Sequence, residues 1–141
     1  MARIAIELPP TFVFSTEVPL YTCHINKSGH LDNALLLTVV AEARSRYFAT
    51  LGYDEEDIEG VSTITADVAV KYQSEAFHGE VMVVELRPMD FNRYGYDLVF
   101  RIGDKASGRE VARGKQGFVL FDHGTKKVVP MPEAFRKIIG G

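Results

Sequence analysis

The pattern of hydrophobic positions predicts one long buried helix over residues 33–51. Its first half, NALLLTVVA, is apolar almost all round, and charged residues return only in its second half. A helix that is apolar on every side must be enclosed by the rest of the protein. Gly52 follows where a left-handed C-terminal cap is expected, and either Asp32 or Asn33 can accept a hydrogen bond from a free N–H of the first turn.

The period of the pattern changes from 3.6 to 2 after an acidic connector over residues 53–60, which predicts strands. The expected strands cover residues 11–22 before the helix and residues 62–73, 79–89, 94–102 and 109–122 after it, with a short helix over 132–139. Successive strands with short links must be antiparallel, because parallel pairs need long crossovers. One helix enclosed by such a sheet predicts an α+β fold.

The sequence also predicts local features of the strands and of one turn. Pro88 is expected to end the strand over residues 79–89, and Gly108 to supply a positive φ in the turn DKASG. Gly114 and Gly117 indicate bulges or a close backbone approach. The alternation in the strand over residues 62–73 predicts one buried face, made up of Ile64, Ala66, Val68, Val70 and Tyr72.

Length and composition describe an ordinary globular protein. The 141 residues predict one domain, and 46% apolar with 25% charged residues is a usual balance. A net charge of −3 gives no reason to expect nucleic acid or an anionic membrane as a partner. The N-terminus lacks the pattern of a secretory signal, and no apolar run approaches the roughly 18–20 residues of a membrane helix. We therefore expect a cytoplasmic protein.

The single cysteine, Cys23, excludes an intrachain disulfide and a thiolate metal cluster. Cys23 and His24 do not form a nucleophile–base pair on a strand, because adjacent side chains point to opposite faces. We expect Cys23 to be a small buried hydrophobic residue. The four histidines lack the spacing of metal ligands, so no metal site is expected.

The loop before the buried helix carries the candidate chemistry. Residues 24–32, HINKSGHLD, hold two histidines, an asparagine and an aspartate. The free N–H groups and the positive dipole end of the helix attract developing negative charge at this place.

The loop and helix resemble a known family. Gly29-His30-Leu31-Asp32-Asn33-Ala34 and Glu42-Ala43-Arg44 match the loop and helix motifs of the hot-dog acyl-CoA thioesterases of the 4-hydroxybenzoyl-CoA thioesterase-like group. The segments VKYQSEAFHGE, FNRYGYDLVFRI and REVARGKQGFVLFD are also similar, so the resemblance covers residues 12–137. It implies a hot-dog fold, in which a five-stranded antiparallel sheet wraps around one long central helix.

The resemblance implies an acyl-CoA thioesterase that releases a carboxylic acid and coenzyme A. Coenzyme A would then be part of the substrate, and no other cofactor is expected. The active form would be a homodimer or a homotetramer with sites at the subunit interface, which also agrees with the bare edges of a single sheet. Two alternatives stay open: a non-catalytic module that binds acyl-CoA or acyl-carrier protein, and a dehydratase on the same fold.

One departure from the family concerns the catalytic carboxylate, four residues before the motif histidine. That position is Asn26 here, and an amide cannot ionise to act as a base, although it can orient a water molecule. The resemblance assigns His30 as the motif histidine and the N–H of Asn33 as the oxyanion donor. Asp32 is a second departure, because it places a carboxylate where the family often has asparagine.

Four residues are candidates for the general base: Asp32, Glu42, His24 and His30. Glu42 lies nine residues past Asn33, about 13 Å along a helix axis, so it would reach a ligand from further along or across an interface. Its alternative role is a salt bridge with Arg46, four residues on. Asp32 could instead be a plain helix cap.

Basic side chains on the later strands are candidates for the nucleotide phosphates of coenzyme A. They are Arg87, Arg93, Arg113 and Lys115. The alternative is that these charges are simply solvated.

Overall fold

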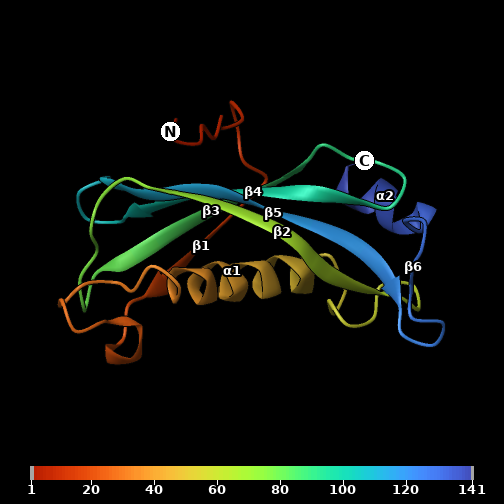
Figure 1. The fold of residues 1–141 in the computed structure, drawn as a ribbon, viewed down its shortest axis with the longest axis horizontal. Coiled ribbons are helices and arrows are strands. Elements are labelled where there is room, and N and C mark those ends of the chain that lie inside the picture. Colours follow the sequence, from red (N-terminus) through yellow and green to blue (C-terminus); the bar gives the residue numbers. More distant parts are fainter. Residues whose placement is uncertain (1, 141) are drawn as a thin grey trace.

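An antiparallel sheet arches over one long helix in the computed structural model, which describes residues 2–140 (Figure 1). In chain order the elements are β1 (Phe14–Pro19), the 3₁₀ turn η1 (Thr22–His24), α1 (Leu36–Thr50), β2 (Ser62–Tyr72), β3 (Val81–Met89), β4 (Gly95–Asp104), β5 (Glu110–Asp122), β6 (Lys127–Val128) and α2 (Glu133–Ile139). The strand order is β1-β3-β4-β5-β2, with the two-residue β6 beside β5, and every pair is antiparallel. The predicted α+β arrangement of five strands around a helix is confirmed, with β6 added.

Helix α1 begins three residues later than predicted, because residues 33–35 form a separate turn. The Asp32 carboxylate closes this turn by accepting from the N–H groups of Ala34 (2.9 Å) and Leu35 (3.1 Å). The face of α1 under the sheet is fully buried, yet Leu37 and Ala41 are only partly covered. The protomer therefore encloses this apolar helix incompletely, contrary to the expectation of burial on every side. The described residues include no helix long and apolar enough to cross a membrane.

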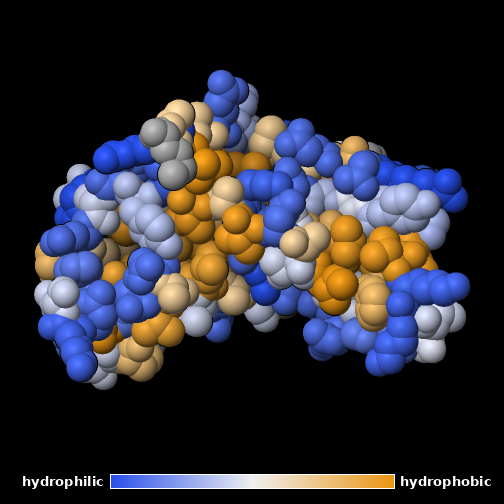
Figure 2. All heavy atoms as spheres, viewed as in Figure 1, coloured by the Kyte–Doolittle hydropathy of each residue, from blue (hydrophilic) through white to orange (hydrophobic). Residues whose placement is uncertain are grey.

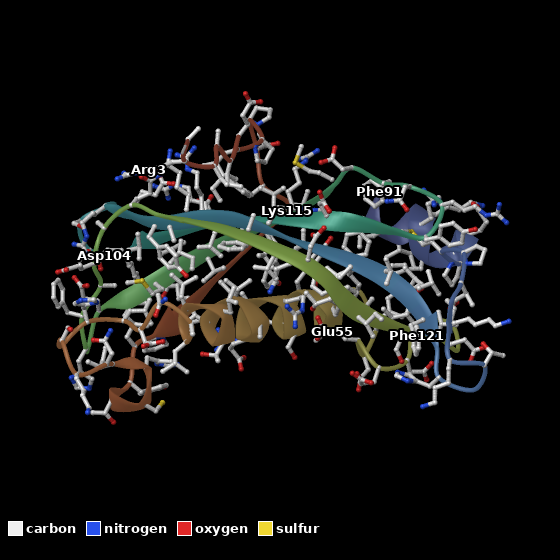
Figure 3. The ribbon with its side chains drawn as sticks, in the orientation of Figure 1. Arg3, Glu55, Phe91, Asp104, Lys115 and Phe121 are labelled. Atoms are coloured by element: carbon white, nitrogen blue, oxygen red, sulfur yellow. The ribbon has the colours of Figure 1, made fainter. Side chains whose placement is uncertain are left out.

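Arg44, the arginine of the helix motif, joins α1 to the sheet. Its guanidinium donates to the side-chain oxygen of the buried Gln116 on β5 (2.6 Å) and to the carboxylate of Glu55 in the connector. The guanidinium also lies over the ring of Phe118, 4.9 Å from its centroid. Figure 3 labels Glu55 beside α1, on the concave side of the sheet. The motif arginine thus has a structural role in holding the helix.

A β-bulge in β2 corrects the predicted alternation of that strand. Thr65 pairs with Phe118 and Asp67 with Gly117, so one extra residue of β2 is unpaired between them. The bulge reverses the faces, since an inserted residue shifts every later side chain. After the bulge, Val68 and Tyr72 lie on the helix-facing side, beside the buried Gln116 and Ala112 of β5, whereas Ile64 lies on the outer side. Val68 and Tyr72 are nevertheless exposed in the protomer, so the prediction that they are buried is wrong. The sequence does not reveal this bulge, because apolar and polar residues continue to alternate through it.

Pro88 does not end β3, which continues to Met89. The backbone of Leu86 faces β1, because its carbonyl accepts from the N–H of Val13. The backbone of residue 88, two positions further along the strand, faces the same side. The pairing with β1 stops at Leu86, and no strand needs an N–H from Pro88.

Gly114 confirms the expected close approach within the sheet. A Cβ at this position would lie 2.4 Å from the carbonyl oxygen of Ala69 and 2.6 Å from the ring of Phe100. Any side chain would therefore separate β5 from β2 or displace the aromatic core.

Helix α2 lies at one end of the molecule (Figure 1). Aromatic rings fill the core at this end. Phe135 of α2 is fully buried, with ring-centroid distances of 6.0 Å to Phe48, 5.5 Å to Tyr53 and 6.0 Å to Tyr96. The Tyr96 hydroxyl has no hydrogen-bond partner among residues 2–140, and burial raises its pKa. Helix α2 thus closes one end of the core.

The turn between β4 and β5 is held by Asp104, and Gly108 has the expected positive φ of 75°. The Asp104 carboxylate accepts from the hydroxyl (2.6 Å) and the N–H (3.0 Å) of Ser107. These bonds, first that of the hydroxyl, lower the pKa of Asp104 below its usual value of 3.8.

We expect Asp104→Asn to lower the melting temperature at pH 7 but to have little effect in acid. A carboxyl group with a lowered folded-state pKa stabilises the fold above its unfolded-state value, and the contribution is lost as the pH falls through the folded-state pKa. The difference in Tm between wild type and variant should therefore shrink below about pH 4. Thermal unfolding at pH 7, 5, 4 and 3 measures it. A difference that stays constant over this range would contradict the assignment.

Candidate active site

The loop before α1 folds back on itself through backbone hydrogen bonds. Asn26 donates its N–H to the carbonyl of His30 (3.0 Å), and Gly29 donates to the carbonyl of Asn26 (3.0 Å). Gly29 has a φ of 88°, which glycine adopts readily. A Cβ at this position would meet no atom within 4 Å, so the backbone angle rather than space favours glycine here. The side-chain oxygen of Asn26 accepts from the N–H of Ser28 (3.0 Å). This turn directs His30 toward the start of the helix.

A second loop, which follows β2, lies against the first. Leu31 donates its N–H to the carbonyl of Ala76 at 2.7 Å. Arg109 fixes the second loop by donating to the carbonyl of Glu75 (2.9 Å) and to the hydroxyl of Ser74 (3.2 Å). The two loops are therefore held together although they lie far apart in the chain.

A pocket of about 390 Å³ opens between these loops and the start of α1. It lies at the end of the sheet where Figure 3 labels Asp104. The lining is Asn26, His30, Leu31, Asn33, Leu36, Tyr72, Gln73, Ser74, Glu75, Ala76 and Val111. The structure therefore brings together three of the predicted site residues, Asn26, His30 and Asn33.

The N–H of Asn33 has no hydrogen-bond acceptor among the described residues, whereas the next two N–H groups are bonded to Asp32. The carbonyl of Asn33 accepts from the hydroxyl of Tyr72 at 2.8 Å. Partial burial and the nearby charge of Asp32 raise the pKa of Tyr72. A free backbone donor at the start of the helical segment thus belongs to a residue that lines the pocket.

Two acidic residues lie near Asn33, and only one of them lines the pocket. Asp32 caps the turn over residues 33–35 rather than α1 itself, whose N-cap is Leu35. Its Oδ1 accepts two N–H groups of this turn, and it is absent from the pocket lining. Glu75, which the sequence did not single out, does line the pocket, and its carboxylate lies 3.6 Å from Nε2 of His30.

Glu42 takes the salt-bridge alternative. Its carboxylate accepts from Nε of Arg46 at 2.7 Å, and Arg46 also donates to Thr16 and Glu17 of β1. Glu42 lines a different depression, of about 350 Å³, on the side of α1 next to β1. The protomer does not bring it to the pocket.

Cys23 is exposed, so the expectation of a buried cysteine is wrong. Residues 22–24 form a 3₁₀ turn rather than part of a strand, which turns the cysteine outward. Nδ1 of His24 accepts from the backbone N–H of Tyr21 at 3.0 Å. Neither Cys23 nor His24 lines the pocket. Within residues 2–140, no group of three histidine, cysteine or acidic side chains is placed to hold a metal ion.

The candidate phosphate-binding cations lie elsewhere in the protomer. Arg113 pairs with Glu110 (2.6 Å), and Lys115 pairs with Asp67 (2.9 Å). Figure 3 labels Lys115 on the outer side of the sheet. Arg93 is exposed beside Tyr94, at the opposite end of β4 from the pocket. Arg87 donates to Thr11. None of the four lines the pocket of a single protomer, and their role toward the coenzyme A phosphates stays a prediction.

Sequence comparison places these features among known proteins. A family model described as the Thioesterase-like superfamily matches residues 21–139, which includes both loops and all the pocket residues. Comparison with the sequences of curated proteins gave no match.

Solved structures share the fold over most of this chain. A 1,4-dihydroxy-2-naphthoyl-CoA thioesterase from Synechocystis is 16% identical with a TM-score of 0.83, covering 90% of this chain and 95% of its own. A DHNA-CoA thioesterase from Staphylococcus aureus is 21% identical with a TM-score of 0.78, covering 87% and 83%. A thioesterase from Thermus thermophilus, solved with coenzyme A and Zn, is 24% identical with a TM-score of 0.80, covering 93% and 100%. The predicted hot-dog fold is confirmed.

Proposed function

Since the chain belongs to the Thioesterase-like superfamily, we propose that it hydrolyses the thioester of an acyl-CoA to a carboxylic acid and free coenzyme A. The observation that carries this proposal is the unbonded N–H of Asn33, a residue that lines the same pocket as His30. The coenzyme A thioesterases of similar fold support the choice of substrate class.

The start of α1 supplies the electrostatic part of the reaction. With the acyl carbonyl oxygen at the N–H of Asn33, the negative charge of the tetrahedral intermediate meets a fixed donor and the positive end of the helix dipole. One such donor is worth about 3 kcal/mol of activation free energy. The apolar side chains of Leu36 and Val111 line the same pocket and would contact the acyl group.

His30 and Asn26 would hold the attacking water beside the thioester. Both side chains lie in the pocket, and the amide of Asn26 has its oxygen engaged by Ser28, which fixes its orientation. Asn26 orients but does not take a proton, because an amide does not ionise.

We also propose that the active form is at least a homodimer, associated along β2. This strand ends the sheet order and pairs only with β5, so one of its edges is free in the protomer. Val68 is 41% and Tyr72 52% exposed on the helix-facing side of this strand. Figure 2 shows apolar residues at the surface in the middle of the face viewed, where Figure 1 draws β2. A second copy here would lie next to the pocket, since Tyr72 belongs to both.

A non-catalytic acyl-thioester binding module is the second candidate. Asn26 favours it, because the position that carries the family's carboxylate holds an amide. Such a module would bind acyl-CoA in the same pocket and release no product.

A panel of acyl-CoAs separates the two functions. Wild-type protein is incubated with short, long and aromatic acyl-CoAs, and released coenzyme A is followed with a thiol reagent. We expect thiol release that falls strongly in His30→Ala. Thermal protection by acyl-CoAs without thiol release would establish the binding module instead, and hydration of an enoyl-CoA without thiol release would indicate a dehydratase.

We expect Tyr72→Phe to reduce kcat/KM about fivefold with the preferred substrate, because the hydroxyl holds the Asn33 peptide in place and a hydrogen bond of this kind contributes about 1 kcal/mol. Steady-state kinetics measure the effect. Tyr94→Phe is the control, because Tyr94 is another exposed tyrosine, at the far end of β4. Equal rates for Tyr72→Phe and wild type would contradict this role.

A further inference from the structure

Glu75 is the one acidic residue among the described residues that line the pocket. The two carboxylates that the sequence singled out near α1 are engaged, since Asp32 caps the turn over residues 33–35 and Glu42 pairs with Arg46. Glu75 makes no comparable bond, and Nε2 of His30 lies 3.6 Å from its carboxylate. A carboxylate is therefore available in a site where Asn26 cannot ionise.

The position of Glu75 is set by its backbone rather than by its side chain. Its carbonyl accepts from the guanidinium of Arg109, and the neighbouring Ala76 accepts from the N–H of Leu31. Arg109 is itself paired with Glu80 at 3.0 Å, so it is not the partner of the Glu75 carboxylate. The side chain, 63% exposed in the protomer, thus remains free to take part in chemistry.

The distance between the side chains of Glu75 and His30 suits a water molecule that bonds to both. A distance of 3.6 Å is too long for a direct hydrogen bond, and polar groups at such a distance are commonly bridged by water. A water held beside both side chains would lie in the same pocket as the N–H of Asn33.

On the basis of the proposed thioesterase function, we propose that Glu75 is the general base of this site, with His30 as its positioning partner. The water oxygen bonds to the thioester carbonyl carbon while its proton passes to the Glu75 carboxylate. The carbonyl electron pair moves to the oxygen, which the Asn33 N–H stabilises. The oxyanion then collapses, the C–S bond breaks, and the proton on Glu75 passes to the sulfur of the leaving coenzyme A.

Glu75→Gln tests this assignment on the full-length protein with the preferred acyl-CoA. We expect kcat to fall by about a hundredfold or more with KM changed little, because the amide preserves shape and loses the base. Glu75→Asp keeps a carboxylate and should recover part of the rate. In wild type, kcat should rise with pH through the ionisation of the base, and this limb should be lost in Glu75→Gln. Glu59→Gln, in the connector far from the pocket, is the matched control and should keep full activity.

The outcomes distinguish the two proposals. If wild type hydrolyses acyl-CoA and folded Glu75→Gln keeps its rate and its pH profile, the role of Glu75 is wrong while the thioesterase function stands. If wild type releases no thiol from any substrate, the proposed function fails and the role of Glu75 falls with it. Thermal unfolding confirms that each variant is folded before the rates are compared.

Discussion

Asn33→Pro should lower kcat by about a hundredfold to a thousandfold, which is the usual loss on removing one oxyanion donor. Proline deletes the backbone N–H that would bind the oxyanion. The deletion breaks no hydrogen bond within the described protein, because this N–H has no acceptor there. Proline is also well tolerated at the start of a helix, and it favours an extended backbone in the residue before it, which is the usual conformation of a capping residue. The variant should therefore fold and bind substrate.

Asn33→Ala is the control for this prediction. It removes the same side chain and keeps the N–H, so its kcat should stay close to that of wild type. Steady-state kinetics with the preferred acyl-CoA, together with Tm values for both variants, make the comparison. If folded Asn33→Pro kept kcat within about threefold of wild type, the backbone donor would play no part in the rate-limiting step.

Phe135→Ala should reduce the free energy of unfolding by about 3–5 kcal/mol, which is typical for truncation of a buried aromatic side chain. Phe135 is fully buried and lies within 6.0 Å, centroid to centroid, of Phe48, Tyr53 and Tyr96. Its removal would leave a cavity where α2 closes the end of the sheet. A loss of this size is a large part of the stability of an ordinary domain. Urea unfolding at pH 7 measures it.

Ile138→Ala provides the matched control on the same helix. Ile138 is 49% exposed, so its truncation should change the free energy of unfolding by less than about 0.5 kcal/mol. Similar losses for the two variants would mean that α2 does not pack as described.

The candidate site was predictable where its residues are neighbours in the chain. The loop motif around His30 and Asn33 immediately precedes an apolar helix, so its place at the helix N-terminus follows from sequence order alone. Glu75 has no such local signal. It reaches the pocket because Leu31 bonds to Ala76 and Arg109 bonds to Glu75, contacts between segments far apart in the chain. The acidic partners of Lys115 have no local signal either, since the register of β5 with β2 and β4 places Asp67 and Asp97 beside it.

The sequence by itself determined the antiparallel α+β arrangement, the buried helix and the polar loop at its start, because hydrophobic period, capping residues and short links are local properties. Only the tertiary structure decided which carboxylates enter the pocket, which face each side chain of β2 takes, and which strands form the edges of the sheet. These features depend on hydrogen bonds and register between distant segments, and a one-residue shift in register exchanges the two faces of a strand. The chemistry of the site thus comes from two loops that meet only in the folded chain.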